Sequence, residues 1–239
     1  MQTITFTIPF SSAQIVFLPE NYGKNMKKAI FIGYYGYWVI LTYAGILSAV
    51  FGVYFAFTGG IRNALICMMI SGVCDTFDGR VARLKKRDER QLNYGIQIDS
   101  MADLIAFGLL PVAIGYALGK SHGSYEPINA VYAAIYVLAA LIRLSYFNAI
   151  EAELQNKNKK RTYFEGLPTT SVALIIPIVY SICSLLQKPF SEGYNIMLAI
   201  ISVLFVLRIK IPKPKFRGQV ILCLFGLPVV FYMFWSGGL

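Results

Sequence analysis

The sequence predicts an all-α fold, a polytopic helical bundle that is integral to a membrane. Hydrophobic residues make up 56% of the 239 residues and charged residues only 14%, and the mean hydropathy is +0.58, which argues against an ordinary water-soluble enzyme. The apolar residues gather in runs of about the 20 residues that a helix needs to cross the hydrocarbon core. The formal net charge of +10 comes largely from Lys and Arg in alternate loops between these runs. This pattern indicates that the basic residues lie at a membrane surface and do not bind nucleic acid.

The apolar runs predict seven membrane spans. In chain order they are residues 36–58, 62–83, 96–119, 128–150, 167–187, 193–209 and 218–236. The stretch TITFTIPFSSAQIVFLP precedes them without a basic region ahead of it, so we expect an interfacial segment rather than a cleaved signal peptide. The expected parts are an N-terminal cytoplasmic or interfacial segment at 1–35, a membrane domain at 36–215, which contains a core of six spans, and an additional C-terminal span at 216–239.

The distribution of basic residues predicts the orientation of the chain. Lys and Arg cluster before the first span and after the second, fourth and sixth, whereas the opposite loops hold only Arg62, Lys120 and Lys188. Because Lys and Arg stay on the cytoplasmic side of membrane proteins, the basic loops are expected in the cytoplasm. Such a face attracts anionic head groups and anionic substrates.

Four aspartates lie within the predicted spans rather than in the loops. Asp75 and Asp78 come near the end of the second span, and Asp99 and Asp103 near the start of the third. An unpaired charge inside a span costs about 2.5 to 3.5 kcal/mol on the insertion scale, so ionisable residues there indicate a functional site. Four carboxylates at the same end of two neighbouring spans require positive charge nearby.

Helical spacing brings these four side chains to two facing stripes. Asp75 and Asp78 are three residues apart, and Asp99 and Asp103 are four apart, so each pair lies on one side of its helix. Antiparallel packing of the two helices would surround one small volume with carboxylate oxygens, which suit Mg²⁺ or Mn²⁺. Two other interpretations remain open at this point: an ion or proton pathway of a transporter, and structural ion pairs with Arg80 and Arg83.

The spacing around the aspartates resembles the signature of the CDP-alcohol phosphatidyltransferase family of integral membrane enzymes. Eight positions match, and they are Asp75, Asp78, Gly79, Ala82, Arg83, Gly95, Asp99 and Asp103. One departure is that the eleven residues from Leu84 to Tyr94 make the spacer a few residues longer than the family's usual one. The extra residues are mostly charged, so we expect them to extend a cytoplasmic turn.

The resemblance implies the chemistry and the ligands of the site. The family transfers a phosphatidyl group from a CDP-linked lipid to an alcohol and releases CMP, with divalent cations, here two Mg²⁺ or Mn²⁺ ions, as cofactors. Asp75, Asp78 and Asp99 are then metal ligands, and Asp103 is a further ligand or the catalytic general base. The implied nucleotide and diphosphate ligands are Asp75, Asp78, Gly79, Ala82, Arg83 and Gly95. The family also implies a homodimer.

A second resemblance concerns the alcohol that accepts the phosphatidyl group. The segment from Arg143 to Asn148, followed by Tyr163 to Thr170, is similar to the RLxxFN and FxGLPxP pair of phosphatidylserine synthases, with Thr170 in place of the last proline. It implies L-serine as acceptor and CDP-diacylglycerol, or CDP-archaeol in an archaeon, as donor. Arg143 is the candidate ligand of the serine carboxylate, and Asn148 of the same motif is the second candidate acceptor-binding residue.

The sequence therefore leaves three functions open. The first is a phosphatidylserine synthase of the cell membrane with its site at the cytoplasmic face. The second is the same chemistry with glycerol 3-phosphate or an inositol phosphate as acceptor, which requires further cations for the acceptor's own phosphate. The third is a cation transporter, which leaves Gly79, Ala82 and Arg83 without a role.

Overall fold

The computed structural model describes residues 32–121, 127–156, 163–212 and 216–235. The chain divides into two compact units, residues 1–34 and 35–239, and only 32–34 of the first unit are described. The predicted interfacial stretch TITFTIPFSSAQIVFLP therefore lies outside the described residues. All the described helices belong to the second unit.

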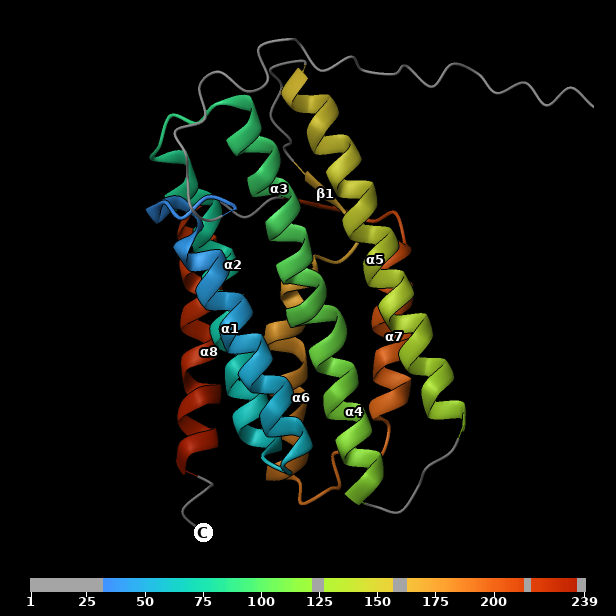
Figure 1. Cartoon of the computed structure of the whole chain (residues 1–239). Coiled ribbons are helices and arrows are strands. Elements are labelled where there is room, and N and C mark those ends of the chain that lie inside the picture. The colour runs from blue at the N-terminus through green and yellow to red at the C-terminus, as the bar shows by residue number, and fades with distance from the viewer. Residues whose placement is uncertain (1–31, 122–126, 157–162, 213–215, 236–239) are drawn as a thin grey trace, which may run out of the picture. The chain divides into compact units, whose positions relative to one another are not determined.

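Helices stand at all seven positions where spans were predicted (Figure 1). In chain order they are α1 (Tyr37–Phe57), α2 (Ile61–Arg83), a continuous run of α3 (Glu89–Asp103), the π-helical η1 (Leu104–Leu109) and α4 (Leu110–Ser121), α5 (Pro127–Asn156), the short η2 (Thr169–Ser171) leading into α6 (Val172–Leu185), α7 (Tyr194–Val206) and α8 (Phe216–Trp235). The predicted all-α bundle is confirmed. It has one addition, a short antiparallel pair of β1 (Tyr163–Glu165) with β2 (Lys210–Pro212).

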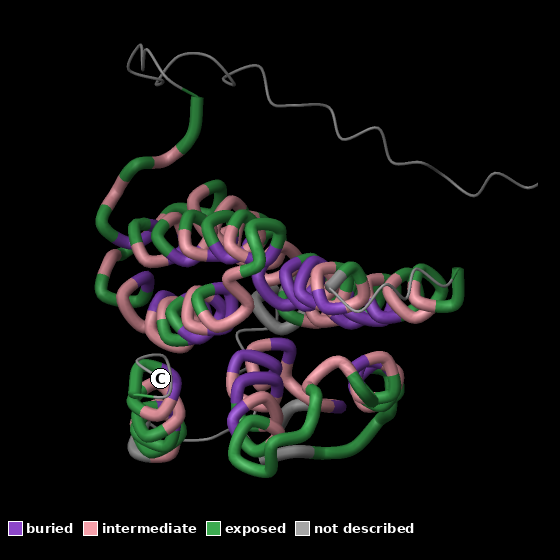
Figure 2. Tube along the Cα trace, turned by 90° about the horizontal axis from the view of Figure 1, so that it is seen from below, coloured by how far each residue is buried: buried purple, intermediate pink, exposed green. Residues whose placement is uncertain are grey.

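Four of the described helices are long and apolar enough to cross a membrane. They are Tyr37–Phe57, Glu89–Lys120, Pro127–Glu151 and Gly218–Trp235, and two shorter apolar helices cover Thr169–Leu185 and Tyr194–Val206. Outward faces carry exposed large apolar side chains such as Phe51, Leu138 and Phe231, while buried residues turn toward neighbouring helices (Figure 2). An apolar outer surface of this extent fits contact with lipid, and the chain is an integral membrane protein.

Small residues allow α1 to pack closely on its neighbours. Gly45, Ala49, Gly52 and Ala56 are all buried along one side of α1, and a Cβ on Gly52 would come within 2.8 Å of Leu110 Cδ2. Membrane helices use such small residues because lipid gives apolar side chains little reason to associate. Hydrogen bonds across the α1 and α2 contact add to the packing, since Ser71 Oγ donates to Gly45 O at 2.8 Å.

The chain between α2 and α3 differs from the expected extended turn. Only residues 84–88 connect the two helices, because α3 begins at Glu89. Asp88 is the N-cap, and its carboxylate accepts a hydrogen bond from Gln91 N at 2.7 Å. An N-cap aspartate followed by an acidic first turn stabilises a helix start. The turn is therefore shorter than the spacer, because about half of the spacer is helical.

The π-helical segment η1 starts directly after Asp103. Such segments occur mostly as single turns inside α-helices and frequently at functional sites. Three residues before Asp75 on α2, α6 approaches so closely that a Cβ on Gly72 would lie 2.5 Å from Ala173 Cβ. This close approach brings η2, which precedes α6, next to the aspartates of α2.

Candidate active site

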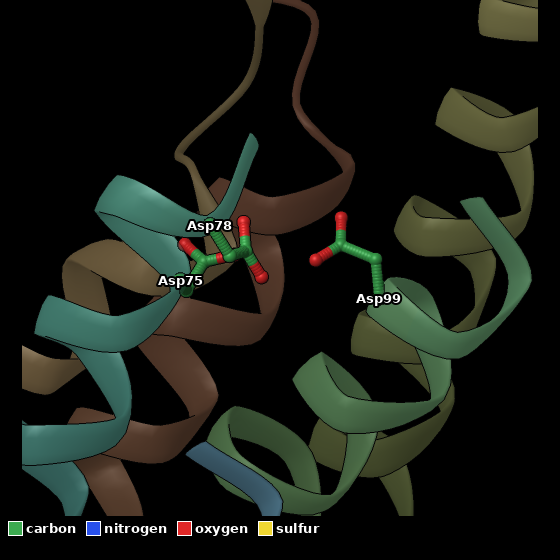
Figure 3. Close-up of side chains that lie close together, drawn as sticks. All are labelled: Asp75, Asp78 and Asp99. Carbon is green, nitrogen blue, oxygen red and sulfur yellow. The ribbon is translucent and has the colours of Figure 1, made fainter. Parts of the chain in front are cut away.

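Three aspartates from two helices converge on one point. Asp75 and Asp78 of α2 and Asp99 of α3 direct their carboxylates toward one another (Figure 3), and one oxygen from each lies within 4.8 Å of the others. Asp78 is buried, and the other two are half-buried. The predicted facing of the α2 and α3 stripes is therefore what the structure has.

Asp103 joins this cluster through Asp75. The side chains of Asp75 and Asp103 are within hydrogen-bond reach of each other, as are those of Asp78 and Asp99. Asp103 is nevertheless not one of the three residues whose oxygens all lie within 4.8 Å. The four carboxylates form one connected group in which Asp103 stands slightly apart.

Three threonines, none of them singled out by the sequence as part of the site, hold these carboxylates in place. Thr42 Oγ1 on α1 donates to Asp78 Oδ2 at 2.9 Å. Thr170 Oγ1 donates to Asp75 Oδ2 at 2.5 Å, and Thr169 Oγ1 donates to Asp103 Oδ2 at 3.3 Å. In the sequence, Thr170 stands out only because the FxGLPxP pattern has a proline at this position. A proline could not donate this hydrogen bond.

Positive charge from the described residues does not neutralise the cluster. No described Lys or Arg forms an ion pair with any of the four aspartates, and the Arg80 guanidinium instead donates to Gln219 of α8. The structural ion pairs considered from the sequence are thus not formed by Arg80. Carboxylate oxygens that pair with no described Lys or Arg are the donor set that hard divalent cations such as Mg²⁺ and Mn²⁺ prefer, so the residues fit a metal site.

The residues predicted to bind the nucleotide lie in different surroundings. Gly79 is exposed, and a Cβ added to it would meet nothing within 4 Å. Arg83 is exposed at the end of α2, whereas Ala82 is buried with 8% of its surface accessible. Gly95 is covered by a side chain, because Arg87 Nη1 lies 2.9 Å from the position of its missing Cβ. Gly79 and Arg83 are therefore the exposed residues among those predicted to bind the nucleotide.

The residues predicted to bind the acceptor are built into the contacts between helices. Arg143 is buried, and its Nη1 donates to Glu165 O at 2.9 Å and to Phe205 O at 3.2 Å. Asn148 Oδ1 accepts a hydrogen bond from Ser100 Oγ at 2.7 Å. Ser100 follows Asp99 directly, so Asn148 ties α5 to the part of α3 that carries the cluster.

Gly166 shapes the turn that leads from β1 to the two threonines. Its φ is +74°, and a Cβ would lie 2.8 Å from Leu207 O and 3.0 Å from Phe205 O. Its backbone N donates to Ile209 O at 2.7 Å. Only glycine tolerates both the left-handed backbone and the close approach of carbonyl oxygens. The GLPTT segment thereby reaches the aspartates in a fixed path.

Comparison with known proteins identifies relatives of the same kind. The model of the family described as CDP-alcohol phosphatidyltransferase matches residues 39–208. The chain is 34% identical over 146 residues to the CDP-diacylglycerol–serine O-phosphatidyltransferase of Saccharomyces cerevisiae, which covers 59% of this chain and 50% of that protein. It is 30% identical over 185 residues to the enzyme of that name from Helicobacter pylori strain 26695, covering 74% and 71%.

An archaeal relative has a related name. The archaetidylserine synthase of Methanothermobacter thermautotrophicus is 29% identical over 173 residues, which cover 72% of this chain and 67% of that protein. The chain thus spans about half the length of the yeast relative and about two thirds or more of the other two. All eight signature positions lie inside the residues that the family model matches. The chain belongs to the CDP-alcohol phosphatidyltransferase family.

Proposed function

We propose that this chain transfers the phosphatidyl group of CDP-diacylglycerol, or of CDP-archaeol, to the hydroxyl of L-serine and releases CMP. The observation that carries the proposal is the group of four aspartates, held by threonines and left without a described cationic partner, in a chain of this family. The names of the three relatives support serine as the acceptor. A cation transporter has no support from these relatives and gives no reason for Gly79 and Arg83.

In this proposal Asp75, Asp78 and Asp99 hold two divalent cations, Mg²⁺ or Mn²⁺. When bound, such ions neutralise the charge that develops on the transferring phosphoryl group. Asp103 is the general base, which its position slightly apart from the other three supports. Its carboxylate removes the proton of the serine hydroxyl, whose oxygen then attacks the phosphorus on the lipid side of the diphosphate. The bond from this phosphorus to the oxygen of CMP breaks, and CMP leaves with the electron pair.

The proposed arrangement in the membrane follows from the charge distribution. Lys85, Lys86 and Arg87 lie between α2 and α3, at the same end of the helices as the aspartates, whereas Arg62 lies at the other end of α2. On the positive-inside rule we propose that the site lies at the cytoplasmic face, where water-soluble serine and a lipid donor can both enter. We further propose that residues 36–215 are the catalytic domain, that 216–239 are an added span, that 1–35 lie at the cytoplasmic surface and that the chain forms a homodimer.

The decisive experiment is CMP release by the purified protein in detergent. CDP-diacylglycerol and CDP-archaeol are each supplied with Mg²⁺ or Mn²⁺ and with serine, glycerol 3-phosphate, inositol or inositol phosphate in turn. We expect release that requires both serine and metal. Release with a phosphorylated acceptor instead would keep the chemistry and reject serine. If no acceptor supports release while metal crosses liposome membranes, the transporter replaces this proposal.

The hydrogen bond from Thr170 to Asp75 predicts an effect on metal binding. Thr170→Val keeps the shape of the side chain and removes the donor, so Asp75 loses a partner that fixes its orientation. Residues that hydrogen-bond to a metal ligand typically contribute about 10- to 100-fold in metal affinity, and we expect the Mn²⁺ concentration for half-maximal activity to rise by about tenfold. Thr76→Val is the control, because Thr76 Oγ1 donates within its own helix to Gly72 O. Equal metal requirements in the two variants would contradict the prediction.

The role proposed for Arg143 predicts a selective loss of serine affinity. Arg143→Ala is expected to raise the KM for serine by at least about tenfold, as loss of a charged hydrogen bond does, and to leave the KM for the CDP lipid nearly unchanged. Since Arg143 also donates to two backbone carbonyls, the melting temperature should fall as well. A parallel rise of both KM values would assign Arg143 a structural role only.

A further inference from the structure

The connection between α2 and α3 places two cations over one tryptophan. Trp38 of α1 has only 2% of its surface exposed. Lys85 Nζ lies 5.9 Å, and the Arg87 guanidinium carbon 5.3 Å, from the centre of its ring. Both distances are within the range of cation–π attraction. The indole is therefore a fixed platform that holds these two side chains against α1.

Arg87 also lies against the side of α3 that carries Asp99, one of the proposed metal ligands. Its Nη1 occupies the space that the missing Cβ of Gly95 leaves open, 2.9 Å from that position. Asp99 follows Gly95 by four residues on the same side of α3, and Thr42, which binds Asp78, follows Trp38 by four residues on α1. Residues four apart stand one above the other on a helix. The Arg87 guanidinium thus lies one helical turn from the aspartate cluster, on its outer side.

The charge around Arg87 is unbalanced. Burial lowers the pKa of Arg87, and the nearby Arg83 guanidinium lowers it further, although an arginine stays protonated at neutral pH. Among the described residues, no acidic side chain forms an ion pair with Arg83, Lys85 or Arg87. Two guanidinium groups that repel each other beside an ammonium group provide a site for an anion with more than one charge, and guanidinium geometry suits phosphate oxygens.

We propose that Arg87 binds the diphosphate of the CDP-linked donor, together with Arg83, and that Lys85 and Trp38 hold it in position. This inference rests on the proposed function and adds a donor-binding residue from the lengthened spacer, outside the eight signature positions. In this arrangement Gly95 serves the donor indirectly, because its lack of a side chain makes room for the guanidinium. The diphosphate would lie between the Arg83 and Arg87 pair and the metal site.

The test measures binding of CDP, which carries the same cytidine and diphosphate, to the full chain in a nonionic detergent with Mg²⁺. Arg87→Ala is expected to raise the Kd for CDP, and the KM for CDP-diacylglycerol, by at least about tenfold, with the KM for serine changed less than about twofold. Lys86→Ala is the matched control, because it removes the same charge from the neighbouring exposed position and should leave both constants unchanged. Melting temperatures confirm that the variants are folded.

A double-mutant cycle separates direct from indirect action of Gly95. In Gly95→Ala the new methyl group must displace Arg87, so this variant should weaken CDP binding as Arg87→Ala does, and the double variant should be no weaker than either. Equal CDP affinity in the wild type and Arg87→Ala would overturn the inference while leaving the proposed function intact. Equal losses of CDP affinity in Arg87→Ala and Lys86→Ala would mean that Arg87 acts only through the general surface charge. This result would also overturn the inference. No CDP binding and no CMP release by the wild type would overturn both.

Discussion

Asp78→Asn, like Asp75→Asn, is expected to abolish CMP release, with a loss of at least about 1000-fold in kcat/KM, since metal ions contribute several kcal/mol to such reactions. Asparagine has the same size, and its carbonyl oxygen can still accept the hydrogen bond that Thr42 donates to Asp78. What disappears is one negative charge from the group that would hold the cations. The measurement is the rate of CMP release as a function of CDP-diacylglycerol concentration, with saturating serine and Mn²⁺.

The stability of these variants distinguishes a lost ligand from a lost fold. Without metal, the carboxylates of Asp75, Asp78 and Asp99 repel one another, so removing one charge should leave the melting temperature unchanged or raise it. With metal, only the wild type should be stabilised, because a ligand stabilises the state that binds it. Asp88→Asn is the matched control: it makes the same chemical change at the N-cap of α3, where asparagine is an equally good cap. Activity close to wild type in Asp78→Asn would remove the metal site from the proposal.

Gly166→Ala should produce the second large effect, on both stability and activity. A non-glycine residue in the left-handed region costs about 1 to 3 kcal/mol, and the new Cβ would also lie within 3.0 Å of two carbonyl oxygens and of Arg143 Nη1. The turn must then shift, and with it Thr169 and Thr170, which hold Asp103 and Asp75. Displacement of a catalytic group by about 1 Å can cost 100-fold in rate, so we expect a loss of about that size in kcat/KM.

A second glycine separates backbone strain from steric overlap. Gly193, before α7, has a φ of +79°, and a Cβ there would meet nothing within 4 Å. Gly193→Ala therefore carries the strain without the overlap, and we expect a modest fall in melting temperature with normal activity. Thermal unfolding and CMP release of both variants measure the difference. If Gly166→Ala behaved like Gly193→Ala, the path of the GLPTT segment would not control the aspartates.

The positions of the aspartates could be inferred from spacing because helical geometry is local. Once Asp75 and Asp78 are in one helix and Asp99 and Asp103 in the next, the three- and four-residue intervals determine which sides they occupy. The start of α3 could also have been read from the sequence, since Asp88 before Glu89 is a common capping pattern. Charge alone does not reveal this start, because the charged residues from Lys85 to Arg90 continue across it.

The second layer of the site depends on contacts between residues far apart in the chain. Thr170 donates to Asp75 across 95 positions, and Thr42 to Asp78 across 36. Arg143 was expected at the acceptor because a carboxylate requires a cation, yet its Nη1 also donates to the carbonyls of Glu165 and Phe205. A motif identifies such residues as present but does not say which neighbour each of them contacts.

The sequence by itself therefore determined that this chain is a helical membrane protein, which apolar runs form its helices and which four carboxylates share one site, because hydropathy and helical periodicity are properties of consecutive residues. Only the tertiary structure decided what surrounds these carboxylates. Close packing at Gly72 and the turn at Gly166 bring Thr169 and Thr170 to the aspartates, and the gap at Gly95 accommodates Arg87. These are steric and hydrogen-bond relations between distant segments, and they exist only when the helices are packed.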